Sequence, residues 1–180
     1  MSFLFDSKFE MPVLLPRLVA REALLRQLDR VLEGRLAVVS APAGFGKTTL
    51  LGQWCRTVRD RGVHVAWLSL AERENEPGRL LEHVIGALAR VSDRTVEALP
   101  SIIDASPMLP IEVILTRLVN GITAWKHELV LVIDDAHFLT DPEIGAIFDA
   151  LLAYAPPNFR IVLATRGAVP IKVATLRMRG

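Results

Sequence analysis

The chain is poor in cysteine, in surplus charge and in long apolar runs. Cys55 is its only cysteine, so an internal disulfide is excluded and a reducing compartment fits. The 21 basic and 20 acidic residues leave a net charge of +1, which gives no indication of a surface that binds nucleic acid by charge alone. No apolar stretch approaches the roughly 20 residues that cross a bilayer, and residues 1–15 lack a signal-peptide pattern. These absences predict a cytoplasmic protein without membrane contacts.

What the chain does contain is enough apolar material for one compact domain. Hydrophobic residues make up 51% of the sequence, and charged residues of both signs are spread through it, which is typical of a folded protein and not of a disordered one. A chain of 180 residues can bury roughly two-thirds of the surface that it exposes when unfolded. Short apolar runs alternate with longer amphipathic stretches, and this alternation predicts an α/β fold.

The predicted strands are four short apolar runs: Leu36–Ser40, Val63–Leu70, Leu129–Ile133 and Arg160–Thr165. Helical periodicity is found in Val19–Leu32, Thr48–Arg59, Pro77–Val91, Ile111–Lys126 and a stretch after Asp141, which caps it with Pro142 in the first turn. Trp54 and Trp67 fall in these patterns and are predicted core residues, while Glu72–Pro77 is a predicted polar loop. The fully apolar third strand indicates a parallel sheet that is covered on both faces.

The segment APAGFGKT, from Ala41 to Thr48, matches the phosphate-binding pattern G-x-x-x-x-G-K-[ST] except at its first position. It lies between a predicted strand and a predicted helix, as the pattern requires. Glycines let such a loop curl until its backbone N–H groups point at a polyphosphate. The predicted nucleotide-binding residues here are Ala43, Gly44, Phe45, Gly46, Lys47, Thr48 and Thr49. The alternative is a plain strand-to-helix turn with a surface lysine.

Each residue at the end of this loop has a predicted role. Lys47 is expected to reach the β and γ phosphates and to take part in catalysis, while the hydroxyl of Thr48 is expected to ligate Mg²⁺. Thr49 is expected to cover the α phosphate. Phe45, a large apolar residue between two glycines, is expected to shape the loop or to pack outward and not to contact phosphate.

An acidic pair, Asp134 and Asp135, directly follows the apolar run Leu129–Ile133. Carboxylates at the end of a buried strand are costly to bury without a cation, and Mg²⁺ would supply one. We therefore assign Asp134 to the metal, through a water molecule, and Asp135 to positioning or polarising the attacking water, as a general base. We place this strand beside Leu36–Ser40, so that the acidic pair faces Lys47. The alternative is that both carboxylates cap the following loop.

Two further residues follow the ends of predicted strands. Arg166 comes directly after the fourth strand, and a parallel sheet would bring it to the same edge, where it could stabilise the γ phosphate as a third catalytic residue. The alternative is a solvated loop arginine. His137 lies two residues beyond the acidic pair, and its role is open between orienting a carboxylate or water and supporting the loop.

Four strings occur in the order found in one known family: VVSAPAGFGKTTLLGQW, VAWLSL, LVLVIDDAHFLTD and RIVLATRGAVPIKVATLRMRG. Together they resemble the ATPase domain of MalT-like, LuxR-type large transcription regulators, which belong to the STAND class of signalling P-loop ATPases. The resemblance covers the chain from about Leu15 onward. The loops of this family commonly begin with alanine, as this one does at Ala41.

The resemblance implies a P-loop NTPase fold, a three-layer α/β sandwich with a mostly parallel central sheet. It also implies adenine selectivity, with Pro16 and Arg17 lying over the base. Residues 1–18 would then be a partly extended N-terminal segment and residues 19–180 the nucleotide-binding domain. The last strand of the family's sheet is expected to be missing beyond Gly180, and the sensor and DNA-binding domains would follow later.

For function, the resemblance implies a switch that rests with ADP, self-associates with ATP when an inducer binds the sensor domain, and resets by slow hydrolysis. DNA would be bound only through a C-terminal domain absent from this chain. Three alternatives are a dedicated P-loop ATPase, another STAND signalling protein and a small-molecule kinase. A kinase would need a lid with arginines after the third strand, and Phe138–Ala155 contains none.

Overall fold

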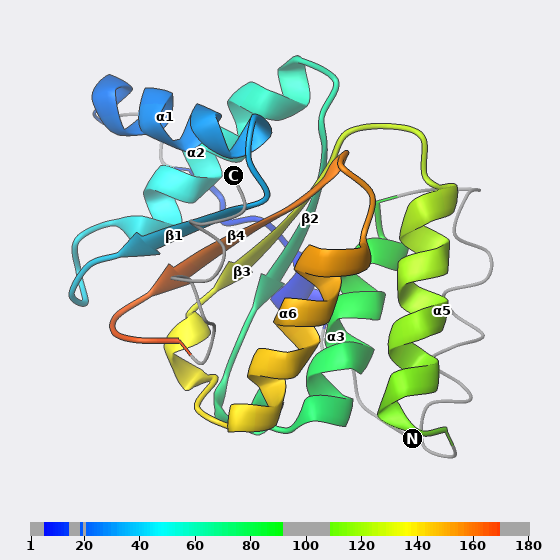
Figure 1. The fold of residues 1–180 in the computed structure, drawn as a ribbon. Helices are drawn as coiled ribbons and strands as arrows, with labels where there is room; N and C mark the ends of the chain where they lie inside the picture. Colours follow the sequence, from blue (N-terminus) through cyan, green and yellow to red (C-terminus); the bar gives the residue numbers. More distant parts are fainter. Residues whose placement is uncertain (1–5, 15–18, 20, 92–108, 170–180) are drawn as a thin grey trace.

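The computed structural model describes residues 6–14, 19, 21–91 and 109–169, and its centre is a sheet of four parallel strands (Figure 1). The strands are β1 (Leu36–Ser40), β2 (His64–Ser69), β3 (Leu129–Asp134) and β4 (Phe159–Thr165), in the order β1-β4-β3-β2. Each predicted strand is therefore present to within one residue at either end, and the predicted α/β fold with a parallel sheet is confirmed.

The predicted neighbour relation between the β3 and β1 strands is wrong, because β4 lies between them. Ser40 of β1 is opposite Thr165 of β4, and Ile133 of β3 is opposite Leu163 of β4. A strand that follows a single helical crossover commonly pairs beside the strand before it, which places β4 next to β3. Nearly all of β4 is buried, as its interior position requires. Asp134 is consequently two strands away from the loop that follows β1.

Helices cover both faces of the sheet (Figure 1). One face carries α1 (Glu22–Asp29), the 3₁₀ turn η2 (Arg30–Leu32) and α2 (Lys47–Asp60). The other carries α3 (Pro77–Ala89), α5 (Ile111–Ala124) and α6 (Pro142–Tyr154). The predicted start of α6 is confirmed, since the Asp141 side chain accepts a 2.8 Å hydrogen bond from the backbone N–H of Glu143. Among the described helices, none has the length and apolar character of a bilayer span.

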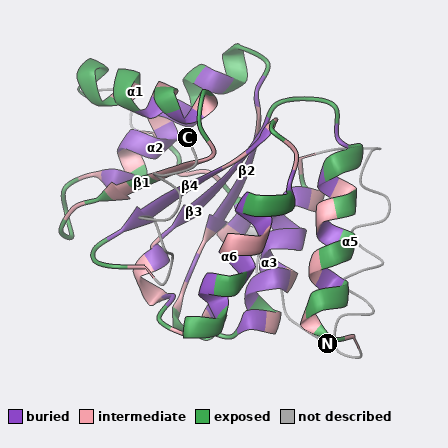
Figure 2. Cartoon of the chain, in the orientation of Figure 1, coloured by how far each residue is buried: buried purple, intermediate pink, exposed green. Residues whose placement is uncertain are grey.

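Two hydrophobic clusters fill the space between the sheet and its helices. Most residues of β2, β3 and β4 are buried (Figure 2). Every residue of β3 is buried, and its side chains alternate between the two clusters. Trp54 and Trp67 are core residues, as predicted. Cys55 packs in the same cluster, where burial raises the pKa of its thiol to about 12. The thiol is thus a structural group and not a reactive one.

The N-terminal segment joins the two helical layers. Its 3₁₀ turn η1 (Asp6–Phe9) lies against β2, and Phe9 stacks with His83 of α3 at a ring-centroid distance of 6.1 Å. Further along, Pro12 and Leu14 lie so close to Gly52 of α2 that an added Cβ there would come within 3.1 and 3.0 Å of them. Residues 6–14 therefore pass from the α3 side of the molecule to the α2 side.

The predicted polar loop Glu72–Pro77 is more ordered than the sequence indicates. It contains a 3₁₀ turn, η3 (Glu72–Glu74), and Glu74 is only 2% exposed. Lys8 of η1 pairs with one Glu74 carboxylate oxygen, and the backbone N–H of Ala71 donates to the other at 2.7 Å. The predicted polar loop thus contains a short helical turn and a buried carboxylate, whose charge is paired with that of Lys8, a residue distant in the sequence.

Candidate functional site

The loop between β1 and α2 has the shape that the sequence predicts. Gly44 and Gly46 have backbone φ angles of 79° and 72°, in the left-handed region that residues with a Cβ rarely occupy. Gly46 is the N-cap of α2 and accepts the backbone hydrogen bond of Leu50 at 2.9 Å. The first turn of α2 therefore opens directly from the loop, and free N–H groups at a helix start are a ready anion site.

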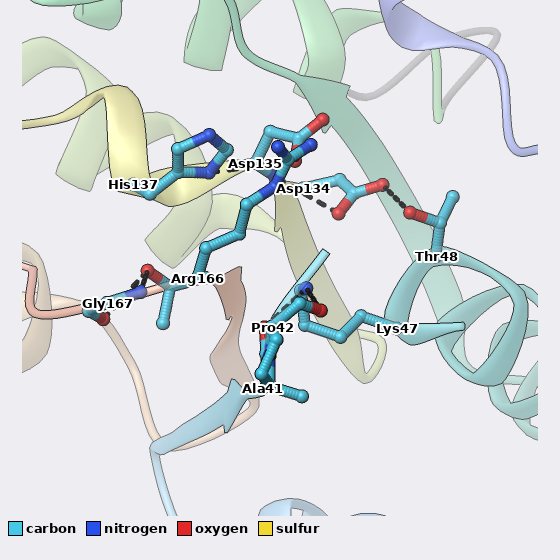
Figure 3. Close-up of polar contacts among 10 residues, drawn as sticks. Ala41, Pro42, Lys47, Thr48, Asp134, Asp135, His137, Arg166 and Gly167 are labelled. Carbon is cyan, nitrogen blue, oxygen red and sulfur yellow. Dashed lines mark hydrogen bonds and ion pairs between the residues drawn. The ribbon is translucent and has the colours of Figure 1, made fainter. Parts of the chain in front are cut away.

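Lys47 folds back over this loop (Figure 3). Its side chain is nearly buried, and its Nζ donates to the carbonyl oxygens of Ala41 at 2.7 Å and Pro42 at 3.0 Å. The charge thus lies at the centre of the loop, held by neutral acceptors. Phosphate oxygens can replace these carbonyls, since a charged acceptor makes the stronger hydrogen bond.

The two predicted metal ligands contact each other. The Thr48 hydroxyl donates to Asp134 Oδ2 at 2.6 Å, and the backbone N–H of Asp135 donates to Asp134 Oδ1 at 2.9 Å (Figure 3). Asp134 is 3% exposed. Burial raises the pKa of its carboxyl, which the Thr48 hydrogen bond and the charge of Lys47 oppose only in part. A hydroxyl and a buried carboxylate form an oxygen donor set that fits Mg²⁺, and a cation would offset the cost of burying the carboxylate.

Asp135 lies between two basic side chains (Figure 3). Its Oδ1 is 3.4 Å from Arg166 Nη2 and 3.6 Å from His137 Nδ1. Arg166 reaches this point because Thr165, buried at the end of β4, accepts a 3.1 Å hydrogen bond from Gly167 and turns the chain there. His137 Nδ1 is buried without a hydrogen-bond partner in the described part of the chain. The three side chains form one group at the carboxyl edge of the sheet.

The remaining predicted site residues lie around the loop. Phe45 is 60% exposed and points outward, as expected. Ala43 is exposed, and Thr49 is half-buried in the first turn of α2. Pro16 and Arg17, predicted to contact adenine, lie outside the described residues.

Sequence reasoning missed Arg21, which contacts the loop from the start of α1. Its guanidinium donates to the carbonyl of Phe45 at 2.8 Å, and its Nη2 is 3.5 Å from where a Cβ on Gly46 would lie. The sequence signal for Arg21 is weak, because an arginine in the first turn of a predicted helix, here Val19–Leu32, is ordinarily solvated. Arg21 thus contacts Phe45 and Gly46, the two residues that precede Lys47, and holds the loop at this point.

Comparisons with known sequences agree with this geometry. A family model for the AAA ATPase domain matches residues 17–163. The HTH-type transcriptional regulator MalT of Serratia proteamaculans is 33% identical over 176 residues, and MalT of Klebsiella pneumoniae subsp. pneumoniae is 31% identical over the same length. Each alignment covers 98% of this chain and 19% of the relative. The chain thus spans about a fifth of the length of these regulators.

Solved structures show the same fold at low sequence identity. Cdc6p from Pyrobaculum aerophilum superposes with a TM-score of 0.64 and 20% identity, over 98% of this chain and 48% of that one. The Aeropyrum pernix ORC2 protein, solved as ADPNP–ADP complexes, gives 0.53 and 19%, over 95% and 47%. The family match, the phosphate-loop geometry and the MalT relatives lead to one assignment: the chain belongs to the AAA ATPase domain family and is a P-loop ATPase domain similar to that of the MalT regulators.

Proposed function

We propose that this domain binds ATP or ADP with Mg²⁺, hydrolyses ATP slowly, and acts as the nucleotide-controlled switch of a MalT-like transcription regulator. The observation that carries the proposal is the convergence of three elements at one sheet edge. Lys47, the first residue of α2, folds back over the loop that follows β1. The Thr48–Asp134 pair links α2 to β3, and Arg166, directly after β4, reaches Asp135. These are the groups that phosphoryl transfer needs, namely a loop for phosphates, oxygen ligands for a metal, a base and a cation.

For binding, the loop supplies N–H donors and a lysine charge. Residues 43–49 surround the phosphates, and Lys47 exchanges the carbonyls of Ala41 and Pro42 for oxygens of the β and γ phosphates. Thr48 and Asp134 hold Mg²⁺, which neutralises phosphate charge when it is bound. The family resemblance implies that Pro16 and Arg17, which lie outside the described residues, contact adenine, and such a contact would favour ATP and ADP over GTP.

For hydrolysis, Asp135 is the general base. A water oxygen attacks the γ phosphorus, the bond from that phosphorus to the β–γ bridging oxygen breaks, ADP leaves, and the proton of the water passes to the Asp135 carboxylate. His137, 3.6 Å from Asp135 Oδ1, orients the carboxylate. Arg166 pairs with the same oxygen and can turn to the γ phosphate. Because Arg166 must leave Asp135 to contact the γ phosphate, we expect slow turnover. Slow turnover suits a switch whose ATP-bound state must last.

The regulatory part of the proposal is supported by the relatives. They are HTH-type transcriptional regulators, and this chain matches 19% of their length. Self-association in the ATP state, an inducer bound by a sensor domain and DNA bound by a C-terminal domain would belong to the longer protein. The ATPase domain would control the first of these through its nucleotide.

Calorimetric titration with ATP, ADP and GTP in the presence of Mg²⁺ tests the binding step. We expect adenine-selective binding that is lost in Lys47→Ala and kept in Lys126→Ala, a control that removes an exposed lysine elsewhere. Equal affinity of Lys47→Ala and the wild type would contradict the assignment of the loop. Asp135→Asn separates binding from chemistry, because it should bind ATP with near wild-type affinity and hydrolyse it about a hundredfold more slowly or worse.

A further inference from the structure

Asn75 connects the loop after β2 to the loop that follows the acidic pair. Its Oδ1 accepts from the backbone N–H groups of Thr140 at 2.7 Å and Asp141 at 2.9 Å, and its Nδ2 donates to the Thr140 hydroxyl at 2.8 Å. Three hydrogen bonds from one half-buried side chain thus fix the residues that lead into α6.

The segment so fixed begins with a strained residue. Asp135 has a φ of 55° and is the only non-glycine residue with a positive φ in the described part of the chain. This conformation is uncommon for a residue with a Cβ, although Asp adopts it more often than most, and it persists where the surrounding structure supports it. The segment from Asp135 to Asp141 is held at one end by β3, where Asp134 pairs with Ser69, and at the other by α6 and Asn75. Asn75 is therefore one of the restraints that keep Asp135 strained.

The backbone of Asn75 is itself held in place by neighbouring contacts. It follows the 3₁₀ turn η3, whose last residue is the buried Glu74, and its backbone N–H donates to the Glu72 carbonyl at 3.2 Å. Glu74 is anchored by Lys8 and by the Ala71 N–H. A side chain mounted on such a turn can restrain its partner loop, because its own backbone has little freedom to follow that loop.

We propose that Asn75 is a positioning residue for ATP hydrolysis. By holding Thr140 and Asp141, it keeps Asp135 in the conformation in which the carboxylate lies 3.4 Å from Arg166 and 3.6 Å from His137. Without these hydrogen bonds the segment can relax and Asp135 returns to an ordinary backbone conformation. Its carboxylate then moves away from Arg166 and His137 and from the position needed to activate water. This inference rests on the proposed role of Asp135, and Asn75 acts only through that residue.

Asn158 offers a matched control. It too is a half-buried asparagine that ties loops together, donating from Nδ2 to the carbonyls of Trp125 at 3.1 Å and His127 at 2.7 Å. It lies just before β4 and so at the amino edge of the parallel sheet, opposite the site. Replacing Asn158 by alanine should lower stability in the same way as replacing Asn75, but leave Asp135 in place.

The test is single-turnover ATP hydrolysis by the 180-residue chain, with nucleotide affinity and melting temperature measured on the same variants. For Asn75→Ala we expect hydrolysis to slow about ten- to hundredfold, as for other small misplacements of a catalytic group, with the ATP dissociation constant changed less than about twofold. Asn75→Asp keeps the acceptor for both N–H groups next to the start of α6, so most of the rate should return. Asn158→Ala should hydrolyse ATP at the wild-type rate.

The NMR signals of the His137 ring give a second readout that does not need turnover. Assigned with His137→Gln, they should shift in Asn75→Ala and stay in place in Asn158→Ala. The proposal is overturned if Asn75→Ala hydrolyses ATP as the wild type does, or slows no more than Asn158→Ala, or leaves the His137 signals unmoved. If the wild type binds ATP without hydrolysing it, the proposed ATPase activity fails and the role of Asn75 in hydrolysis fails with it, whereas a wild type that hydrolyses ATP with an unaffected Asn75→Ala overturns the role of Asn75 alone.

Discussion

Replacing Lys8 by methionine removes the partner of a buried carboxylate and tests how the N-terminal segment is held. Glu74 is 2% exposed, while the Lys8 side chain is 19% exposed. Burial alone would raise the pKa of Glu74, but the hydrogen bonds from Lys8 and Ala71 outweigh it, so the pKa lies below its ordinary value. Methionine keeps most of the apolar stem of lysine and loses only the charge.

The expected loss of stability follows from what remains around Glu74. Breaking a buried ion pair by removing one partner costs about 3–5 kcal/mol. Here the Ala71 N–H bond is kept and His83 Nε2 lies 3.5 Å from the carboxylate. We therefore expect the free energy of unfolding to fall by about 2–3 kcal/mol, which for a domain of this size lowers the melting temperature by roughly 5–10 °C.

The pH dependence of this loss has a definite sign. In the wild type, the pKa of Glu74 is lower when folded than when unfolded, so its stabilising contribution is present at neutral pH and is lost as the pH falls through the folded pKa. In Lys8→Met the two contributions of the lysine are lost, and we expect burial, the largest single influence, to raise the pKa of Glu74 above its unfolded value. The penalty is then largest at neutral pH and disappears as Glu74 takes up a proton. The stability difference between the two proteins should therefore shrink on acidification.

Urea unfolding at pH 7 and about pH 5, followed by the fluorescence of the buried tryptophans, measures both effects. Lys126→Met is the control, because Lys126 is exposed and should tolerate the change. A loss below about 0.5 kcal/mol at pH 7, the value of a surface pair, would mean that Lys8 does not stabilise a buried Glu74 carboxylate. A difference that grows on acidification would contradict the expected pKa shift of Glu74.

Three further predictions concern the phosphate loop and the core. Gly46→Ala, with a φ of 72° and Arg21 within 3.5 Å of the new Cβ, should abolish ATP binding in calorimetry while costing about 1–2 kcal/mol of stability in urea unfolding. Arg21→Ala should weaken ATP binding about tenfold by releasing the Phe45 carbonyl, and Arg26→Ala, which removes an exposed arginine from the same helix, should not. Cys55, with a thiol pKa of about 12, should react with a disulfide reagent about a thousandfold more slowly than a free cysteine until urea unfolds the chain.

The strands could be predicted from the sequence because each is a short, mainly apolar run, and β3 and most of β2 and β4 are buried. The order of the strands could not. β3 and β4 are both apolar throughout most of their length, so neither run indicates which of them pairs with β1. The strand order is determined by hydrogen bonding between strands and by the short crossover through α6. Neither produces a recognisable pattern in the sequence.

The site was predictable to the extent that its residues follow strand ends. The sequence assigns Thr48 and Asp134 to one metal ion, and the Thr48 hydroxyl lies 2.6 Å from Asp134 Oδ2. The two meet although Thr48 is on α2, which follows β1, and β4 separates β1 from β3. The contacts that maintain the geometry of the site are harder to predict from the sequence. Arg21, Glu74 and Asn75 are polar residues in stretches that look solvated, and each gains its partner only when distant segments meet.

The charged groups of the site each have a partner within the chain, and this has a consequence for affinity. Lys47 is held by loop carbonyls, Asp134 by Thr48, and Asp135 by Arg166. Binding a nucleotide therefore replaces existing hydrogen bonds instead of adding new ones. The binding free energy gained at Lys47 is the difference between a hydrogen bond to a phosphate oxygen and one to a carbonyl oxygen. The loop conformation, in turn, is already held by two left-handed glycines and by Arg21. Little ordering entropy is then lost on binding, and the affinity should depend more on charge than on folding of the loop.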